Sequence, residues 1–175
     1  TGIPASPAFS RTYDRAKARE AFGLPQDKQV VLALAGAKLP QPYVHFRAAI
    51  GEMLPFMHAM PSMQLVIVAG ADEVAEYGLA NVTVLGYVNA MAELMEAADV
   101  VICKPGGLTV TECLCAHAPM ILLGRAYGQE KANVRMLTAA GAAMAATTPR
   151  ELLDTLRHIS DHSASAHAML MNASI

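Results

Sequence analysis

Short runs of apolar residues recur along the chain, and a segment of helix length follows most of them. The runs are apolar at nearly every position instead of at alternate positions, which indicates strands that are buried on both faces. Such burial is typical of a parallel sheet that carries helices on both sides. The pattern predicts six strands, the last of them alanine-rich and weak in β-propensity, over residues 29–35, 64–69, 81–85, 99–103, 119–123 and 142–146.

The segments between the runs place apolar residues at helical spacing. Asn89 and Thr148 stand where a helix is expected to begin and are predicted to cap two of the helices, and Pro55 is expected to bend or end another. Strands and helices that alternate in this way predict an α/β fold, a doubly wound, Rossmann-like parallel sheet of about six strands. The predicted helices cover residues 11–22, 42–60, 89–98, 108–117, 129–140 and 149–160.

The length of 175 residues suits one domain of ordinary size. Residues 1–10, with two prolines and mostly small side chains, are expected to form a linker, and residues 11–160 the domain itself. A chain that opens on a linker and lacks an initial methionine suggests a piece of a longer protein, although processing of a complete protein gives the same start. The apolar, methionine-bearing segment 161–175 is expected either to pack on a part outside this pattern or to fray.

Composition excludes several classes of protein. A hydrophobic content of 54% against 16% charged residues argues against disorder, and a net charge of −2 without a basic stripe argues against nucleic-acid binding. No apolar run approaches the roughly 18–20 residues that a membrane span needs. Three cysteines with one C-x-C pair fit neither a disulfide framework nor a zinc knuckle, and the six histidines form no ligand pattern. We therefore expect reduced thiols in the cytosol and no metal site.

The stretch CKPGGLTVTE places two glycines between a predicted strand and a predicted helix. In open α/β sheets, ligands bind beyond the carboxyl ends of the strands. Gly106 and Gly107 let backbone N–H groups approach an anion closely at the start of the helix. Thr109 can supply a hydroxyl to the same anion, and Lys104 can add charge unless Pro105 turns its side chain away. The loop therefore predicts a phosphate site.

Glu112 lies one turn inside the same predicted helix. A carboxylate there repels phosphate but can accept hydrogen bonds from a vicinal diol, so the loop and Glu112 together have the shape of a site for a nucleotide ribose. Thr109-x-x-Glu112 is also a capping box, in which the two side chains only satisfy amides of the helix, and both interpretations stay open. The chain has no G-x-G-x-x-G, Walker A or G-x-S-x-G motif, which excludes the common dinucleotide, P-loop and serine-hydrolase sites.

Five segments carry a resemblance to a known family: TGIPASPAF at 1–9, VLALAGA at 31–37, VLGYV at 84–88, KPGGLTVTE at 104–112 and GQEKAN at 128–133. In this order and spacing they resemble the C-terminal half of glycosyltransferase family 28. The monogalactosyl- and processive glucosyl-diacylglycerol synthases belong there, with the peptidoglycan glycosyltransferase that adds N-acetylglucosamine to lipid I. The resemblance covers residues 1–146 and implies the C-terminal, donor-binding half of a GT-B fold, which pairs two Rossmann-like domains.

The resemblance implies that the chain binds a UDP-sugar. Glu112 is expected to bind the ribose diol, and Tyr87 and Val88 to offer backbone groups and an apolar wall to uracil. The residues expected to hold the diphosphate are Gly106, Gly107, Leu108 and Thr109, with Lys104 beside them.

The donor sugar and the first-strand loop follow from the same resemblance. Gln129 and Glu130 are expected to bind sugar hydroxyls, and Asn133 to support that loop. Gly36 and Ala37 are expected to form the phosphate-side loop after the first strand. Relatives carry more glycine there, whereas this chain has the bulkier Lys-Leu-Pro at 38–40, so the loop either contacts phosphate differently or serves the acceptor side.

For the whole protein, the resemblance implies inverting, metal-independent transfer of a hexose from UDP-glucose or UDP-galactose to a membrane lipid such as diacylglycerol, without a cofactor. A missing N-terminal domain is expected to bind the lipid, to supply the general base and to receive the tail 161–175, so that this fragment alone is inactive. The protein is then cytoplasmic and peripheral at the inner face of the membrane. Three alternatives are half of a UDP-sugar epimerase, a nucleotide-binding module without a transferase partner, and a fragment whose loops only cap helices.

Overall fold

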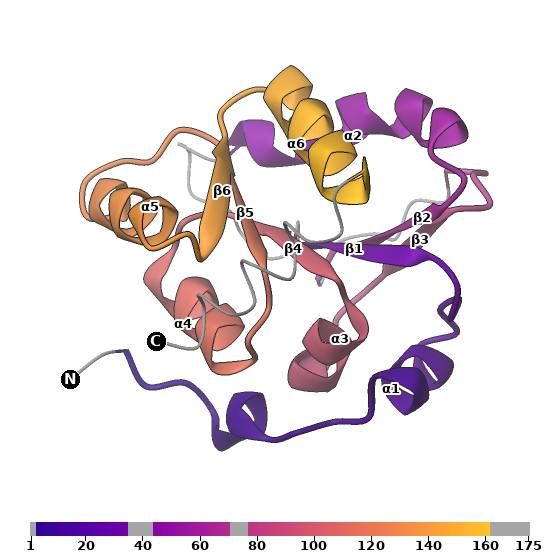
Figure 1. Ribbon diagram of the computed structural model, residues 1–175, viewed down its shortest axis with the longest axis horizontal. Helices are drawn as coiled ribbons and strands as arrows, with labels where there is room; N and C mark the ends of the chain where they lie inside the picture. The colour runs from indigo at the N-terminus through magenta and orange to yellow at the C-terminus, as the bar shows by residue number, and fades with distance from the viewer. Residues whose placement is uncertain (1–2, 35–43, 71–76, 162–175) are drawn as a thin grey trace.

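The computed structural model describes residues 3–34, 44–70 and 77–161, and its centre is a parallel sheet (Figure 1). The strand order is β3-β2-β1-β4-β5-β6, so the order reverses between β1 and β4, where ligands of doubly wound sheets bind. All six predicted strands are confirmed, including the alanine-rich sixth. The strands are β1 (Gln29–Leu34), β2 (Met63–Val68), β3 (Val82–Leu85), β4 (Val100–Cys103), β5 (Met120–Leu123) and β6 (Ala143–Ala146).

Helices cover both faces of the sheet (Figure 1). On β1, Val31 and Ala33 belong to the core on one face, and Val30 and Leu32 belong to the core on the other. This double burial explains why the predicted strands are apolar at successive positions. One face carries α2 (Val44–Met53), the 3-10 helix η3 (Leu54–Ala59) and α6 (Pro149–Asp161). The other carries η1 (Pro7–Ser10), α1 (Arg15–Ala21), α3 (Met91–Ala97), α4 (Gly107–Cys115) and α5 (Glu130–Ala139).

The helix ends confirm two of the sequence predictions and correct others. Pro55 is the second residue of η3, directly after α2 ends, as expected for a residue that stops an α-helix. The Thr148 hydroxyl accepts a hydrogen bond from the Glu151 amide at 3.2 Å and caps α6. Asn89 does not cap α3, since that helix begins one residue later, with Ala90 at the cap. The first helix is shorter than 11–22 because the Asp14 side chain caps it at Arg15.

The N-terminal segment packs on the domain before the first helix begins. Phe9, in η1, is buried in the core that also holds α3 and α4. Whether residues 1–10 link two domains stays a prediction, and the predicted tail 161–175 lies almost wholly outside the described residues. Within the described ranges, no helix is both long enough and apolar enough to cross a membrane.

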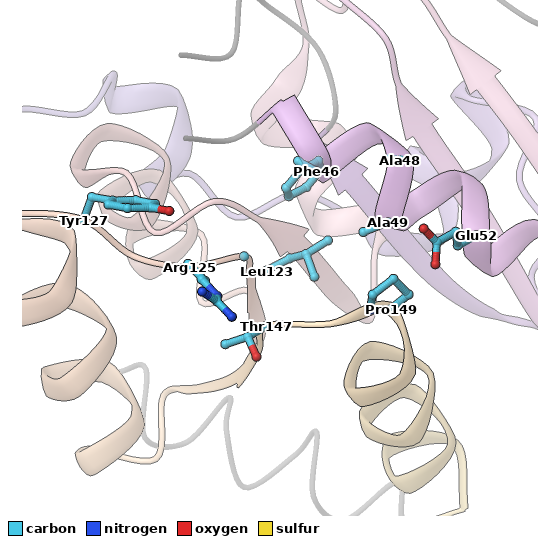
Figure 2. Close-up of a pocket in the computed structure, with 10 residues that line it drawn as sticks. Phe46, Ala48, Ala49, Glu52, Leu123, Arg125, Tyr127, Thr147 and Pro149 are labelled. Carbon is cyan, nitrogen blue, oxygen red and sulfur yellow. The ribbon is translucent and has the colours of Figure 1, made fainter. Parts of the chain in front are cut away.

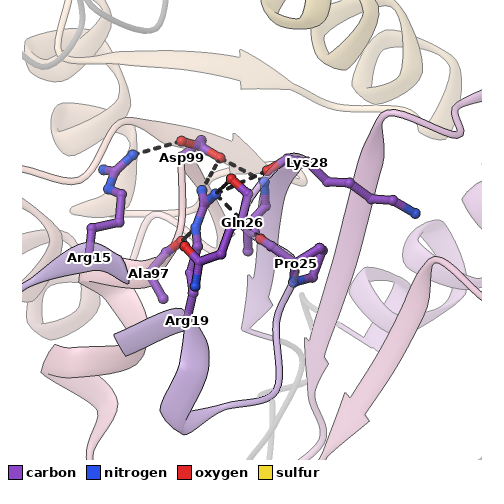
Figure 3. A network of polar contacts seen from close by, with 8 residues as sticks. Arg15, Arg19, Pro25, Gln26, Lys28, Ala97 and Asp99 are labelled. Carbon is purple, nitrogen blue, oxygen red and sulfur yellow. Dashed lines mark hydrogen bonds and ion pairs between the residues drawn. The ribbon is translucent and has the colours of Figure 1, made fainter. Parts of the chain in front are cut away.

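A network of charged groups fastens α1 to the amino end of the sheet (Figure 3). The Asp99 carboxylate accepts hydrogen bonds from Arg15 at 2.7 Å, from Arg19 at 2.8 Å and from the Val30 amide at 2.7 Å. The Arg19 side chain is only 7% exposed and also donates to backbone carbonyls, among them that of Ala97 at 3.0 Å. A buried guanidinium with this many acceptors is fully compensated, so the network holds the edge opposite the predicted site.

Candidate functional site

The loops that leave the carboxyl ends of the strands meet at one edge of the sheet, because all strands are parallel. The described residues show four of these loops, after β3, β4, β5 and β6. Gly36 and Ala37, and the bulky segment 38–40, lie outside the described residues.

The loop after β4 ends in a helix start without a side-chain cap. Gly106 is the cap residue of α4, and Gly107 is the first helical residue. The capping-box alternative is wrong, because Thr109 stands inside the first turn, three residues after the cap. The first-turn amides of α4 thus face the sheet edge without a side-chain acceptor from the cap residue. Such amides, with the helix dipole behind them, bind anions.

Lys104 reaches back over this helix start. A methyl group placed on Gly106 would lie 3.2 Å from the Lys104 Cε and 3.4 Å from its Nζ. Pro105 therefore does not turn the lysine away from the loop, which was the doubt that the sequence raised. The ammonium adds a positive charge to the amides at the start of α4.

Gly107 lies close to the N-terminal segment. A methyl group on Gly107 would overlap the Ile3 Cδ1. The Ile3 Cδ1 is the tip of an exposed side chain that can move aside, so this contact is compatible with the close approach of phosphate that the sequence predicts. Leu108, the next residue, has an exposed side chain at the same end of the helix.

The α5 helix is joined to the loop after β4 by a side-chain hydrogen bond. The Asn133 Nδ2 donates to the Pro105 carbonyl at 3.0 Å. The Glu130 Oε1 lies 3.8 Å from the same methyl position on Gly106 that the lysine approaches. The two motifs of the sequence resemblance, 104–112 and 128–133, therefore form one structural unit.

Glu112 carries a half-buried carboxyl group in α4. Burial raises the pKa of Glu112 above its ordinary value of 4.5. Within the described ranges, no hydrogen bond or ion pair to its carboxylate accompanies this burial. A carboxylate that loses water without gaining a protein donor is suited to accept hydrogen bonds from a ligand.

Other predicted residues lie on the loops after β3 and β5. Tyr87, after β3, is 74% exposed, while Val88 packs partly into the core next to α3. Gln129 is exposed and stands at the start of α5, where Gly128 makes the turn with a φ of +52°. The structure thus brings aromatic, amide and carboxylate side chains to the edge where α4 begins.

The structure also shows a cavity that sequence reasoning missed. Its volume is about 310 Å³, and it lies between α2, the loop after β5 and the start of α6 (Figure 2). Arg125 and Glu52 stand on opposite sides of it. The only signal in the sequence was the place of Arg125 after a strand end, on the loop that leads to Gln129. The lining residues are Phe46, Ala48, Ala49, Glu52, Leu123, Gly124, Arg125, Tyr127, Thr147 and Pro149.

The thiols do not form a reactive or metal-binding centre in the part of the chain that the structure describes. Cys103 and Cys113 are buried and Cys115 is half-buried, and all three are free thiols, as the sequence indicated. A hydrogen bond with Cys103 and burial raise the pKa of the Cys113 thiol well above its usual range, which makes it a poor nucleophile. Among the residues that the structure describes, no three His, Cys, Asp or Glu side chains lie together in a way that could hold a metal ion.

The model of the glycosyltransferase family 28 C-terminal domain matches residues 57–174, two thirds of the chain. The chain belongs to this family. The match includes both motifs that meet at the start of α4 and extends through α6. The resemblance that the loops carry in the sequence is thereby confirmed.

Similar proteins agree with this membership. The processive diacylglycerol β-glucosyltransferase of Bacillus pumilus is 28% identical over 180 residues, covering 98% of this chain and 45% of that protein. The crystal structure of Acinetobacter baumannii MurG aligns with a TM-score of 0.64 and 25% identity, over 98% of this chain and 52% of that chain. Anabaena HepE, solved with UDP and glucose, aligns with a TM-score of 0.72 and 17% identity, over 99% and 49% of the two chains. The fold is therefore the C-terminal half of a GT-B glycosyltransferase, and the chain spans about half the length of the curated relatives it matches.

Proposed function

We propose that this chain is the donor-binding domain of a glycosyltransferase that transfers a hexose from a UDP-hexose to a membrane lipid such as diacylglycerol. Membership of glycosyltransferase family 28 supports the reaction class. The name of the Bacillus pumilus relative supports glucose and diacylglycerol, and the UDP and glucose bound to HepE support the kind of donor.

The observation that carries the proposal is the environment of Glu112. Its carboxylate is half-buried and has a raised pKa, which is unfavourable for the unliganded protein unless a ligand compensates it. The ribose diol of UDP offers two donors to this carboxylate while the diphosphate extends to the start of α4. The negative charge of the diphosphate suits the positive end of the α4 dipole, which supports this arrangement.

Each remaining residue has a role in this proposal. The amides of the first turn of α4 and the Lys104 ammonium stabilise the negative charge on the leaving diphosphate, which is the work of a cation in metal-dependent transferases. Tyr87 and Val88 border the uracil, and Gln129 borders the sugar hydroxyls. Gly36 and Ala37 complete the phosphate side. The residues proposed along the diphosphate are Gly106, Gly107, Leu108 and Thr109.

The other parts of the reaction belong to the whole protein. We propose that a second Rossmann-like domain binds the lipid acceptor and supplies the general base, and that transfer inverts the anomeric centre without a metal or another cofactor. UDP-glucose and UDP-galactose both fit, since the two sugars differ at one hydroxyl. A lipid acceptor implies peripheral association with the cytoplasmic face of the membrane.

Calorimetric titration of the chain with UDP, UMP, ADP and NAD tests the proposal. We expect UDP to bind at least about tenfold more tightly than ADP or NAD, a difference of about 1.4 kcal/mol. Glu112→Ala should weaken UDP while the urea midpoint shows a folded protein, and Glu20→Ala, on the exposed side of α1, is the matched control. UDP binding no tighter than that of ADP, or no binding up to millimolar concentration, would refute the proposal.

A further inference from the structure

Two side chains of opposite charge converge on the start of α4. Lys104 comes from the loop after β4, and Glu130 is the first residue of α5. A methyl group on Gly106 would touch both, at 3.4 Å from the lysine Nζ and 3.8 Å from the glutamate Oε1. The ammonium and the carboxylate therefore lie above the same backbone atom.

The first turn of α5 is fixed in this position by a second contact. Asn133 follows Glu130 by three residues and so lies on the same side of the helix. Its hydrogen bond to the Pro105 carbonyl, at 3.0 Å, holds that side of α5 against the loop after β4. This contact keeps the first turn of α5, and with it Glu130, beside the start of α4.

The electrostatics at this point require a negative group. An ammonium placed over a helix N-terminus meets the positive end of the helix dipole, which is unfavourable by itself. Glu130 is an acidic side chain that approaches the same position as the lysine. The diphosphate of a bound donor carries more negative charge and would occupy the same region.

We propose that Glu130 is an internal counter-ion of Lys104, and that the donor diphosphate replaces it when the donor binds. Glu130 is then a positioning residue. It holds the Lys104 ammonium over the first turn of α4, and the ammonium pairs with the leaving diphosphate once the donor binds. This role differs from binding a sugar hydroxyl, which the family resemblance implied for Glu130. It rests on the proposed function, because it requires that UDP binds at this edge.

The test compares UDP with uridine and UDP-glucose in calorimetric titrations of the chain. We expect Lys104→Gln to weaken the binding of UDP about tenfold or more and to leave the binding of uridine unchanged, because a charged hydrogen bond to the diphosphate is lost. We expect Glu130→Gln to strengthen the binding of UDP roughly three- to tenfold at low salt, because a competing carboxylate is removed. The increase in affinity should be smaller at about 300 mM salt, where charges are screened. The gain should disappear in the Lys104→Gln/Glu130→Gln double variant.

The matched controls are Lys17→Gln and Glu20→Gln, which make the same charge changes on exposed positions of α1, away from the site. Circular dichroism and urea midpoints confirm that each variant is folded. If Glu130→Gln leaves UDP unchanged and weakens only UDP-glucose, Glu130 is a sugar ligand, and the counter-ion role is wrong while the proposed function stands. If Glu130→Gln still strengthens UDP binding when Lys104→Gln is also present, the counter-ion role of Glu130 is wrong. If the unmodified chain binds no UDP, both the role and the proposed function fail.

Discussion

Replacing Glu112 with glutamine should change ligand affinity and stability in opposite directions. The substitution keeps the size of the side chain but removes its charge and one of its two acceptor oxygens. If the carboxylate binds the ribose diol, UDP affinity falls. If the carboxylate is a cost to the unliganded fold, the free energy of unfolding rises. A purely structural role of Glu112 would not produce a lower affinity for UDP together with a higher free energy of unfolding.

The size of the affinity loss follows from the contacts. A hydrogen bond to a charged acceptor contributes about 1 kcal/mol more than one between neutral groups, and glutamine loses one acceptor outright. Since Glu112 is only half-buried, solvent screens part of this difference. We expect a loss of roughly 2 kcal/mol, or about thirtyfold in the dissociation constant of UDP. Calorimetry at pH 7 measures it, with Glu20→Gln as the control.

The sign of the stability change follows from the raised pKa of Glu112. The folded protein holds this proton more tightly than the unfolded chain, whose pKa is near the ordinary 4.5. The stability from the protonated carboxyl is fully present below that pH and is lost as the pH rises through the folded-state pKa. Glu112→Gln cannot lose a proton, so it should be more stable than the unmodified chain at pH 7 and lose this advantage on acidification below 4.5.

Urea unfolding followed by circular dichroism measures this difference at both pH values, because other carboxyl groups titrate equally in the two proteins. A Glu112→Gln variant that is less stable at pH 7 would show that the carboxylate has a partner within the protein. An unchanged affinity for UDP would exclude Glu112 from the ribose site. Either result would refute the reasoning from its burial.

Further predictions concern the contacts that hold the fold and the loops. Asp99→Ala should lower the free energy of unfolding by about 3–5 kcal/mol, because the buried guanidinium of Arg19 loses its anion, whereas Arg15→Met should change it by at most about 1 kcal/mol; equal effects in urea unfolding would contradict this order. Asn133→Ala should weaken UDP about fivefold in calorimetry without contacting it, through the loop that its side chain fixes. His117→Gly should raise the unfolding free energy by roughly 0.5–1 kcal/mol, since His117 has a φ of +50°; no gain would mean that a contact of the histidine outweighs the strain.

The fold could be predicted from the sequence because the apolar pattern of the strands is compatible with few arrangements of the chain. A run such as VVLAL in β1 is apolar at consecutive positions, and only a sheet covered on both faces buries such a strand. The helix starts were predicted less well. Asn89 has the residue type of a cap, yet α3 begins one residue later, because a cap is set by the backbone geometry of the loop as well as by residue type.

The site could be predicted in its residues but not in its contacts. Spacing pointed to Gly106, Lys104 and Glu112 on one loop and helix start, and the structure brings Glu130 and Asn133 to the same place. The counter-ion arrangement depends on how α5 packs against the loop after β4, where Asn133 bonds to a residue 28 positions earlier in the chain, and residue spacing does not encode this packing. The capping-box interpretation failed for the same reason: two side chains three residues apart satisfy a motif without fixing where the helix begins.

The amino and carboxyl ends of the strands differ in their charged contacts: those at the amino ends stabilise the fold, and those at the carboxyl ends are proposed to bind the ligand. At the amino edge, Asp99 and Arg19 are opposite charges that compensate each other completely, and this contact resists unfolding. At the carboxyl edge, Glu112 is half-buried without such a partner among the described residues, and Lys104 is opposed by a carboxylate that a ligand can replace. The carboxylate of Glu112, which the ligand is proposed to engage, is not compensated in this way, so it lowers the stability of the unliganded protein. Because the edges share no contacts among these residues, substitutions at one should add to those at the other in stability, and only those at the carboxyl edge should change the affinity for a nucleotide.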